Sequence, residues 1–293
     1  MGEDLNLNRD HVLLISISTL PLVLGSAVAY AIADSTLVGN IVTNLPSFTP
    51  QQIIIQSIVS TILGAGVVFS LFWLMRRRGK KTKKFVVALV VSPILFFVSI
   101  FMGQAFLLIL FKGATNPFQG LVLVFSLAVS LLSIALVVID ALPHMIRNIF
   151  VAFYGSVFGI FMGVTIVTSS MIVLVVTLIV EDHFLTKYSP VPETATLSGK
   201  IGKDPFDYTR IQSESVAVGV GDYVAFSLIA AHAFIFFPTY VWLMSVLLAF
   251  VGVVINITVL AEEEKILPAI PLPGLLALFP WAVHISTLVL MVG

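Results

Sequence analysis

The stretch 118–140, FQGLVLVFSLAVSLLSIALVVID, carries no charge until it reaches Asp140. An α-helix rises about 1.5 Å per residue, so about 20 apolar residues cross the roughly 30 Å hydrocarbon core of a bilayer. Similar blocks recur along the chain, which is 59% hydrophobic and 10% charged, whereas soluble chains are about 25% charged. The sequence therefore predicts an all-α, multi-pass integral membrane protein, placed in the cell membrane if the source is prokaryotic.

Hydropathy predicts nine transmembrane helices. The predicted spans are 11–33, 51–75, 85–111, 118–140, 146–167, 170–189, 216–237, 239–260 and 268–291. The fifth and sixth are divided at residues 168–170, because the uncharged run 149–180 is too long for one helix of ordinary tilt. The fifth span also carries three glycines at four-residue spacing, which predicts a smooth face for close helix packing. They are Gly155, Gly159 and Gly163.

The distribution of basic residues predicts the orientation, because Lys and Arg stay on the cytoplasmic side of membrane helices. The run 76–84, RRRGKKTKK, holds seven of the 15 basic residues. If this run is cytoplasmic, the predicted spans place every other Lys and Arg except Lys112 on the same side. The N-terminus is then cytoplasmic and the C-terminus outside. Residues 1–10 lack the basic start of a signal peptide, so we expect the first span to be retained.

One connection is longer and more polar than the others. Residues 190–215 hold proline, glycine and mixed charge, which predicts a flexible cytoplasmic loop. It divides residues 1–189, with the first six spans, from residues 216–293, with the last three. Alternation over 214–218 favours a short strand before the seventh span.

Two aspartates lie within predicted spans, where ionisable groups are costly and usually functional. Asp34 and Asp140 sit at span ends, which favours an interfacial position. Asp182 lies about 9 to 12 Å inside the cytoplasmic boundary of the sixth span, and Asp222 about 9 Å inside that of the seventh. The two aspartates therefore reach one depth from opposite directions along the chain.

A pair of close carboxylates shares one proton and titrates as a coupled unit. One member then acts as a base toward a water, and the other as an acid toward a scissile carbonyl and its leaving amine. This chemistry fits an aspartic protease. The same pair also fits proton transport.

Two short motifs flank these aspartates. Residues 219–222 read GVGD. The two glycines have no side chain to cover the backbone, so a peptide or a facing helix can approach Asp222 closely. Residues 268–271 read PAIP at the start of the ninth span. Two prolines three apart favour non-helical backbone, which at membrane depth is tolerated only where protein buries it or it lines a water-filled cavity.

Taken together, the span count, the two aspartates and the PAIP segment resemble the presenilin and signal-peptide-peptidase family of intramembrane aspartyl proteases. That family has nine spans, an aspartate in span six usually preceded by Tyr, a G-x-G-D in span seven and a P-A-L segment opening span nine. In this chain Glu181 stands where Tyr is usual, and Ile270 where Leu is usual. A cytoplasmic N-terminus matches presenilins, and the short loop 190–215 suggests a compact, archaeal-like microbial member.

The resemblance implies an endopeptidase that cleaves transmembrane helices or signal-peptide remnants within the bilayer, without cofactor or metal. Its partners would be transmembrane peptide or protein substrates and lipid, and not nucleic acid; the oligomeric state is left open. By the motifs, the implied catalytic pair is Asp182 and Asp222. The implied supporting or substrate-binding residues are Gly219, Val220, Gly221, Pro268, Ala269, Ile270 and Pro271.

Two other functions stay open from the residues alone. A proton- or ion-conducting transporter or leak channel would use the acid pair, the PAIP break and His232 in the seventh span. A prepilin-peptidase-like protease would also use a G-x-G-D aspartate, but would not need a PAL-like segment. A cysteine nucleophile is excluded because the chain has no cysteine, and no H-E-x-x-H motif supports a zinc protease.

Overall fold

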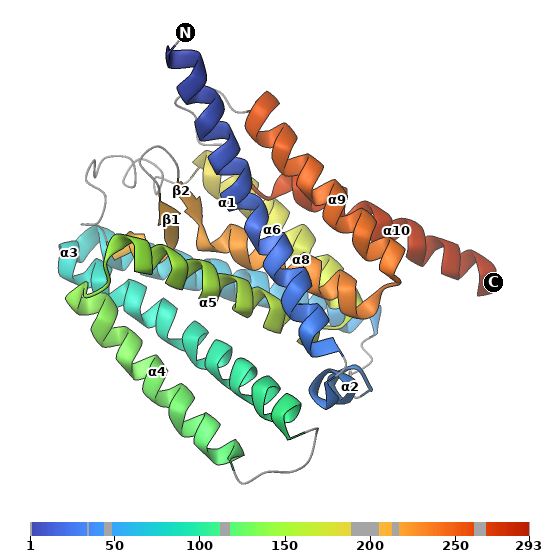
Figure 1. The fold of residues 1–293 in the computed structure, drawn as a ribbon, viewed down its shortest axis with the longest axis horizontal. Coiled ribbons are helices and arrows are strands. Elements are labelled where there is room, and N and C mark those ends of the chain that lie inside the picture. The colour runs from blue at the N-terminus through green and yellow to red at the C-terminus, as the bar shows by residue number, and fades with distance from the viewer. Residues whose placement is uncertain are drawn as a thin grey trace.

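The computed structural model describes residues 2–33, 35–43, 49–111, 118–188, 205–212, 217–260 and 268–292, which are helical almost throughout. Figure 1 shows a bundle of helices with one small two-stranded sheet. The elements are α1 (Gly2–Ala33), α2 (Thr36–Thr43), α3 (Pro50–Leu110), α4 (Gln119–Ile139), α5 (His144–Thr165), α6 (Thr168–Tyr188), the 3₁₀ helix η1 (Pro205–Tyr208), β1 (Arg210–Gln212), β2 (Ala217–Gly219), α8 (Val220–Phe236), α9 (Thr239–Ile255), the π-helix η2 (Asn256–Leu260) and α10 (Pro271–Val292).

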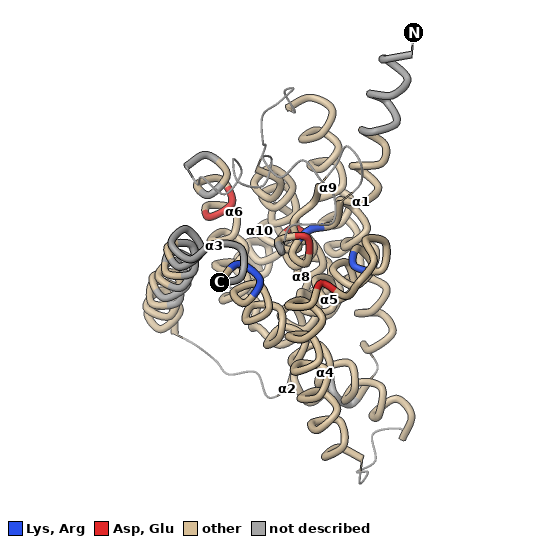
Figure 2. Tube along the Cα trace, turned by 90° about the vertical axis from the view of Figure 1, so that its left-hand side faces the viewer, with Lys and Arg blue, Asp and Glu red and all other residues tan. Residues whose placement is uncertain are grey.

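Six helical segments among the described residues are long and apolar enough to cross a bilayer. They are His11–Ala33, Thr82–Leu110, Gln119–Ile139, His144–Thr165, Thr239–Leu260 and Pro271–Met291. Large apolar side chains cover the outside, for example Leu290 at 81% and Ile139 at 72% exposure, and Figure 2 shows few charged positions among the drawn residues. Apolar surface of this extent marks contact with lipid. The chain is therefore a helical multi-pass membrane protein.

α3 differs from the prediction of two spans joined by a polar loop. Its backbone is helical from Pro50 to Leu110 without a break at 76–84, so the predicted loop is wrong. A straight helix of that length would measure about 90 Å, three times the hydrocarbon thickness. Figure 1 shows both ends of α3 at the right and its middle at the left. The helix therefore doubles back, and each half has the length of about one crossing.

The break between the fifth and sixth predicted spans is confirmed. α5 ends at Thr165 and α6 begins at Thr168. Between them Ile166 has extended backbone, with φ −94° and ψ 136°, so the uncharged run 149–180 forms two helices. The polar run of Thr and Ser that predicted the break lies in the first turn of α6.

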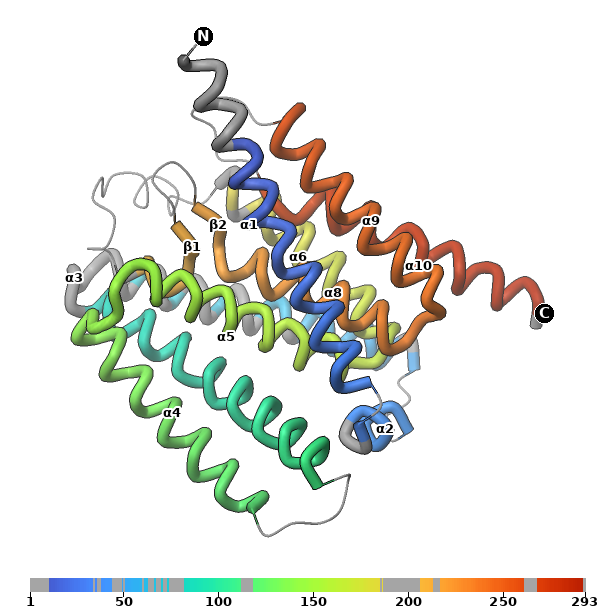
Figure 3. The backbone as a smooth tube through the Cα atoms, in the orientation of Figure 1, coloured from blue at the N-terminus to red at the C-terminus, as the bar shows by residue number. Residues whose placement is uncertain are grey.

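α8 lies at the centre of the bundle, packed between α5 and α1 (Figures 1 and 3). The predicted glycine face is confirmed on the α5 side. A Cβ added at Gly159 would overlap the Val224 carbonyl oxygen, and one added at Gly163 would lie 2.7 Å from the Leu228 carbonyl oxygen. Gly25 of α1 approaches α8 as closely from the other side. These glycines let the helix that carries Asp222 sit against backbone on two sides.

The predicted flexible loop over 190–215 contains regular secondary structure in its described part, residues 205–212. Within it, η1 and β1 are regular, and β1 pairs antiparallel with β2. Ile211 and Val218 face each other in this pairing and are both buried, so packing orders the segment. The strand predicted at 214–218 overlaps β2 at its last two residues; residues 190–204 and 213–216 lie outside the described part of the chain.

Candidate active site

Asp182 lies on α6, six residues before the last residue of that helix, Tyr188. The side chain is half-buried. Its Oδ2 accepts a hydrogen bond from the Ile270 backbone N–H at 2.9 Å, and its Oδ1 accepts one from the Thr186 hydroxyl at 3.4 Å. Asp182 therefore binds the PAIP segment directly, although 88 residues separate it from Ile270 in sequence.

The PAIP segment is non-helical from Pro268 to Ile270, as the two prolines predict, and α10 begins at Pro271. Asn256 supports this backbone: its Nδ2 donates to the Pro268 carbonyl at 3.1 Å and to the Ala269 carbonyl at 3.3 Å. Because Asn256 is 7% exposed, these carbonyls find their donor inside the protein. The segment is thereby held with the Ile270 N–H directed at Asp182.

Asn256 is a residue of the candidate site that was missed from the sequence. It opens η2, the π-helical turn that ends the α9 region, and π-helical turns are frequent at functional sites. In the sequence, Asn256 stands out only as an amide within the largely apolar eighth predicted span. Hydropathy shows that this run forms a helix, but it does not show which way the amide side chain points.

Asp222 lies in the first turn of α8, nearer the helix start than the predicted span 216–237 places it. The helix begins at Val220, and Ala217–Gly219 before it are extended. Gly219 is the N-cap residue, and a Cβ added there would lie 3.7 Å from Asp222 Oδ2. A carboxylate at this third helical position is stabilised by the helix dipole.

The structure brings the elements of Asp182, Asp222 and Ile270 together. α6, which carries Asp182, packs against both α8 and α10. Gly274 of α10 permits this packing, since an added Cβ would lie 3.0 Å from the Ile179 side chain. The elements carrying the two aspartates and the PAIP segment are therefore neighbours.

The other predicted supporting residues line the start of α8. A Cβ added at Gly219 would lie 3.7 Å from Asp222 Oδ2, and one added at Gly221 would meet nothing within 4 Å. The backbone beside Asp222 is therefore bare at Gly221, as the G-x-G-D pattern predicts. Glu181 is half-buried, and within the described residues no hydrogen bond joins it to either aspartate.

His232 serves helix packing rather than the acid pair. It is fully buried on α8, where its Nδ1–H donates to the Gly163 carbonyl at 2.7 Å and its Nε2 accepts from the Thr168 hydroxyl at 3.2 Å. Its ring stacks on Phe236 at 4.4 Å between centroids. Both ring nitrogens are therefore satisfied, and the described residues contain no cluster of three or more His, Cys, Asp and Glu that could hold a metal ion.

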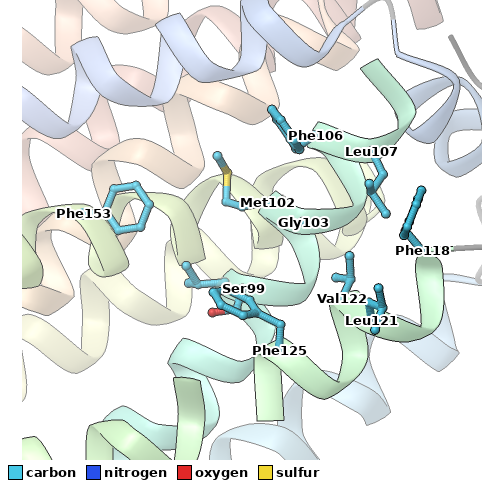
Figure 4. A pocket seen from close by; sticks show the side chains of 11 residues that line it. Ser99, Met102, Gly103, Phe106, Leu107, Phe118, Leu121, Val122, Phe125 and Phe153 are labelled. Carbon is cyan, nitrogen blue, oxygen red and sulfur yellow. The ribbon is translucent and has the colours of Figure 1, made fainter. Parts of the chain in front are cut away.

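A groove of about 590 Å³ lies away from the aspartates, between α3, α4 and α5 (Figure 4). Its lining residues are Val98, Ser99, Met102, Gly103, Phe106, Leu107, Phe118, Leu121, Val122, Phe125 and Phe153. None of these is ionisable, so the groove supplies no acid, base or ligand for catalysis.

The fold and the site together define a multi-pass helical membrane protein in which a carboxylate on α6 binds a non-helical proline segment, and α6 packs against the helix that begins with a second carboxylate. Comparison with known proteins adds no family to this description: no protein-family model matches the chain, and no curated protein sequence matches it.

Proposed function

We propose that the protein is an intramembrane aspartyl endopeptidase of the presenilin and signal-peptide-peptidase type. The observation that carries the proposal is the hydrogen bond from the Ile270 N–H to Asp182, on a helix that also packs against α8, the helix of Asp222. This arrangement supports one site made from a motif resembling P-A-L and two aspartates from separate spans.

In the proposed mechanism the two carboxylates share one proton. The ionised member removes a proton from a water, which attacks the carbonyl carbon of the scissile amide. The protonated member donates its proton to the developing oxyanion, which gives a tetrahedral gem-diol. The member that took up the water proton then donates it to the leaving amine, while the other member takes a proton back from a gem-diol hydroxyl as the C–N bond breaks. Each cycle therefore exchanges the protonation states of the pair twice, restores the starting pair and consumes one water.

The substrate in this proposal is a transmembrane helix that unwinds near the pair. A scissile amide must leave its helical hydrogen bonds before water can attack it. Extended backbone at β2 and non-helical backbone at 268–270 provide groups to which an unwound substrate segment adds as a strand. This geometry favours peptide substrates over small hydrophilic ones.

The proposal includes nine crossings with a cytoplasmic N-terminus. Two crossings come from the halves of α3, and one each from α1, α4, α5, α6, α8, α9 and α10. Asp182 lies near the end of α6 and Asp222 near the beginning of α8, so both lie toward the side of the α6–α8 connection. Water would reach the pair from that cytoplasmic side.

The test is cleavage of a generic transmembrane peptide by the purified protein in detergent or bilayer discs. We expect the wild type to cleave, and Asp182→Asn and Asp222→Asn each to lose at least about 10³-fold in rate, because an amide cannot serve as base or acid. Both variants keep the size of the side chain. Cleavage that survives either substitution would remove the aspartate pair from the mechanism.

A proton or ion conductor is the second candidate, and one observation favours it. The non-helical stretch 268–270 beside the π-helix η2 and the acid pair resembles the broken helices at transporter binding sites. The same preparations in liposomes distinguish the two functions. Flux that depends on Asp182, without peptide cleavage, would replace the protease proposal.

A further inference from the structure

A buried ionic cluster lies at the start of α5, outside the aspartate pair. Arg147 is 2% exposed, and its guanidinium lies 3.2 Å from Asp140 Oδ1 and 3.3 Å from Asp207 Oδ2. Asp207 is equally buried and also binds Arg210 at 2.7 Å. Two nitrogens of the guanidinium, Nε and Nη2, have no hydrogen-bond partner among the described residues. The two ion pairs with Asp140 and Asp207 compensate the buried charge. The cluster joins the end of α4, the start of α5 and the η1 segment.

Tyr208 anchors the same segment beside the cluster. Its ring lies under the Arg147 guanidinium, 5.3 Å from the centroid. Its hydroxyl donates to the Leu136 carbonyl at 3.2 Å, and its own carbonyl accepts from the Tyr154 hydroxyl at 2.5 Å. Tyr154 is fully buried on α5. The 3₁₀ turn of η1 is therefore held by side chain and backbone together.

Asn148 holds the strand that follows. Its Nδ2 donates to the Gln212 carbonyl at 2.6 Å, and its Oδ1 accepts from the Gln212 N–H at 3.1 Å. One amide side chain thus satisfies both backbone groups of Gln212, as a neighbouring strand would. The α5 helix therefore takes the place of a third strand on the β1 side of the hairpin.

The hairpin transmits this anchoring to Asp222. Arg210 pairs with Gly219 across the two strands, and the Val220 N–H donates to the Thr209 carbonyl at 2.8 Å. Gly219 is the N-cap residue of α8, and Asp222 is the third residue of that helix. The backbone hydrogen bonds of the hairpin therefore connect the residues held by α5 to the helical turn that carries Asp222.

From this chain of contacts we propose that Asn148 and Tyr154, with the Arg147 cluster, are positioning residues for Asp222. They fix the 205–212 segment on α5, and the β1–β2 pairing then sets where the first turn of α8 presents its carboxylate to Asp182. This inference rests on the proposed protease function for its catalytic consequence. The anchoring itself is measurable without catalysis.

The first measurement is amide hydrogen exchange of the purified full chain, comparing wild type with Asn148→Ala and Tyr154→Phe. Asn148→Ala removes two hydrogen bonds and Tyr154→Phe one. We expect exchange in peptides covering 208–221 to accelerate by about tenfold or more in the first variant and by about three- to tenfold in the second. Peptides covering 226–236, the buried remainder of α8, should exchange as in wild type.

The second measurement is the pH profile of kcat for transmembrane peptide cleavage. Displacing Asp222 relative to Asp182 changes the coupling of the pair, so we expect kcat to fall by about tenfold to a hundredfold and the profile to shift along the pH axis. A loss of folded protein would scale the profile without shifting it. KM should change less than kcat, since these residues do not contact substrate.

Tyr240→Phe is the matched control. It removes a tyrosine hydroxyl that bonds the His284 Nδ1 at 2.8 Å on α9 and α10, away from the hairpin, and should leave both measurements unchanged. The inference is overturned if exchange at 208–221 stays at the wild-type rate in both variants. It is also overturned if exchange accelerates while an active enzyme keeps its pH profile. A wild type that cleaves no peptide contradicts the proposed function instead, and the exchange result then still decides whether α5 anchors the hairpin.

Discussion

Asn256 is the residue on which the geometry of the PAIP segment depends most directly. Replacing it with Leu would leave the Pro268 and Ala269 carbonyls without their donor. Buried carbonyls that lose their partner cost about 1 to 3 kcal/mol. We therefore expect Asn256→Leu to loosen residues 268–270 and to weaken the contact between the Ile270 N–H and Asp182.

Because the chain has no cysteine, the loosening of residues 268–270 can be measured as the reactivity of a single introduced thiol. Ala269→Cys should react with a maleimide several times faster when Asn256→Leu is also present. Thr258→Val is a suitable control, because the Thr258 hydroxyl bonds only the Val254 carbonyl of its own helix among the described contacts. Equal labelling rates in the Asn256→Leu and Thr258→Val backgrounds would contradict the role given to Asn256.

Gly159 tests the close approach of α5 to α8. A methyl group there would overlap the backbone carbonyl of Val224, which cannot rotate away as a side chain can. We expect Gly159→Ala to lower the free energy of unfolding by about 1 to 3 kcal/mol, measured by denaturant titration in detergent. Gly120→Ala on α4 meets nothing within 4 Å and should change stability by less than about 1 kcal/mol.

At the scale of elements, hydropathy located most helix ends within a few residues because membrane helices are uniform apolar runs. The break near 168, the glycine face of α5 and the non-helical residues 268–270 all follow from local composition. The catalytic role of Asp182 and Asp222 stays a prediction. What the structure adds is that their elements meet, and that Ile270 binds Asp182.

The elements that could not be predicted depend on partners distant in sequence. Arg147 reads as one more cytoplasmic charge, because its partner Asp207 lies 60 residues further along a polar connection. β1 is three residues long and becomes recognisable only beside β2 and Asn148. α3 keeps its helical backbone through a basic run that polarity alone marks as a loop. In each case the structure depends on tertiary contacts or on the continuity of the helical backbone. The local sequence pattern predicts neither of these.

For the whole molecule, the proposed nine crossings make a sharp prediction about which side each connection faces. The cysteine-free chain allows single thiols to be placed one at a time. With a membrane-impermeant maleimide on intact cells, Ala114→Cys and Gly293→Cys should be labelled, because both follow an odd number of crossings from a cytoplasmic N-terminus. Gly79→Cys and Ser198→Cys should be labelled only after the cells are opened.

Each labelling result limits what the other three can be, so a wrong number of crossings would give a distinct labelling pattern. If α3 crossed the membrane once rather than doubling back, Gly79 would fall within the bilayer or emerge on the side opposite to the prediction, and every later position would invert. Labelling of Gly293→Cys only in opened cells, with Gly79→Cys also cytoplasmic, would mean an even number of crossings. In that case Asp182 and Asp222 would open to the cytoplasm only if the missing crossing lay after residue 198, in α8, α9 or α10, because Ser198→Cys reports the side of the connection between the two aspartates.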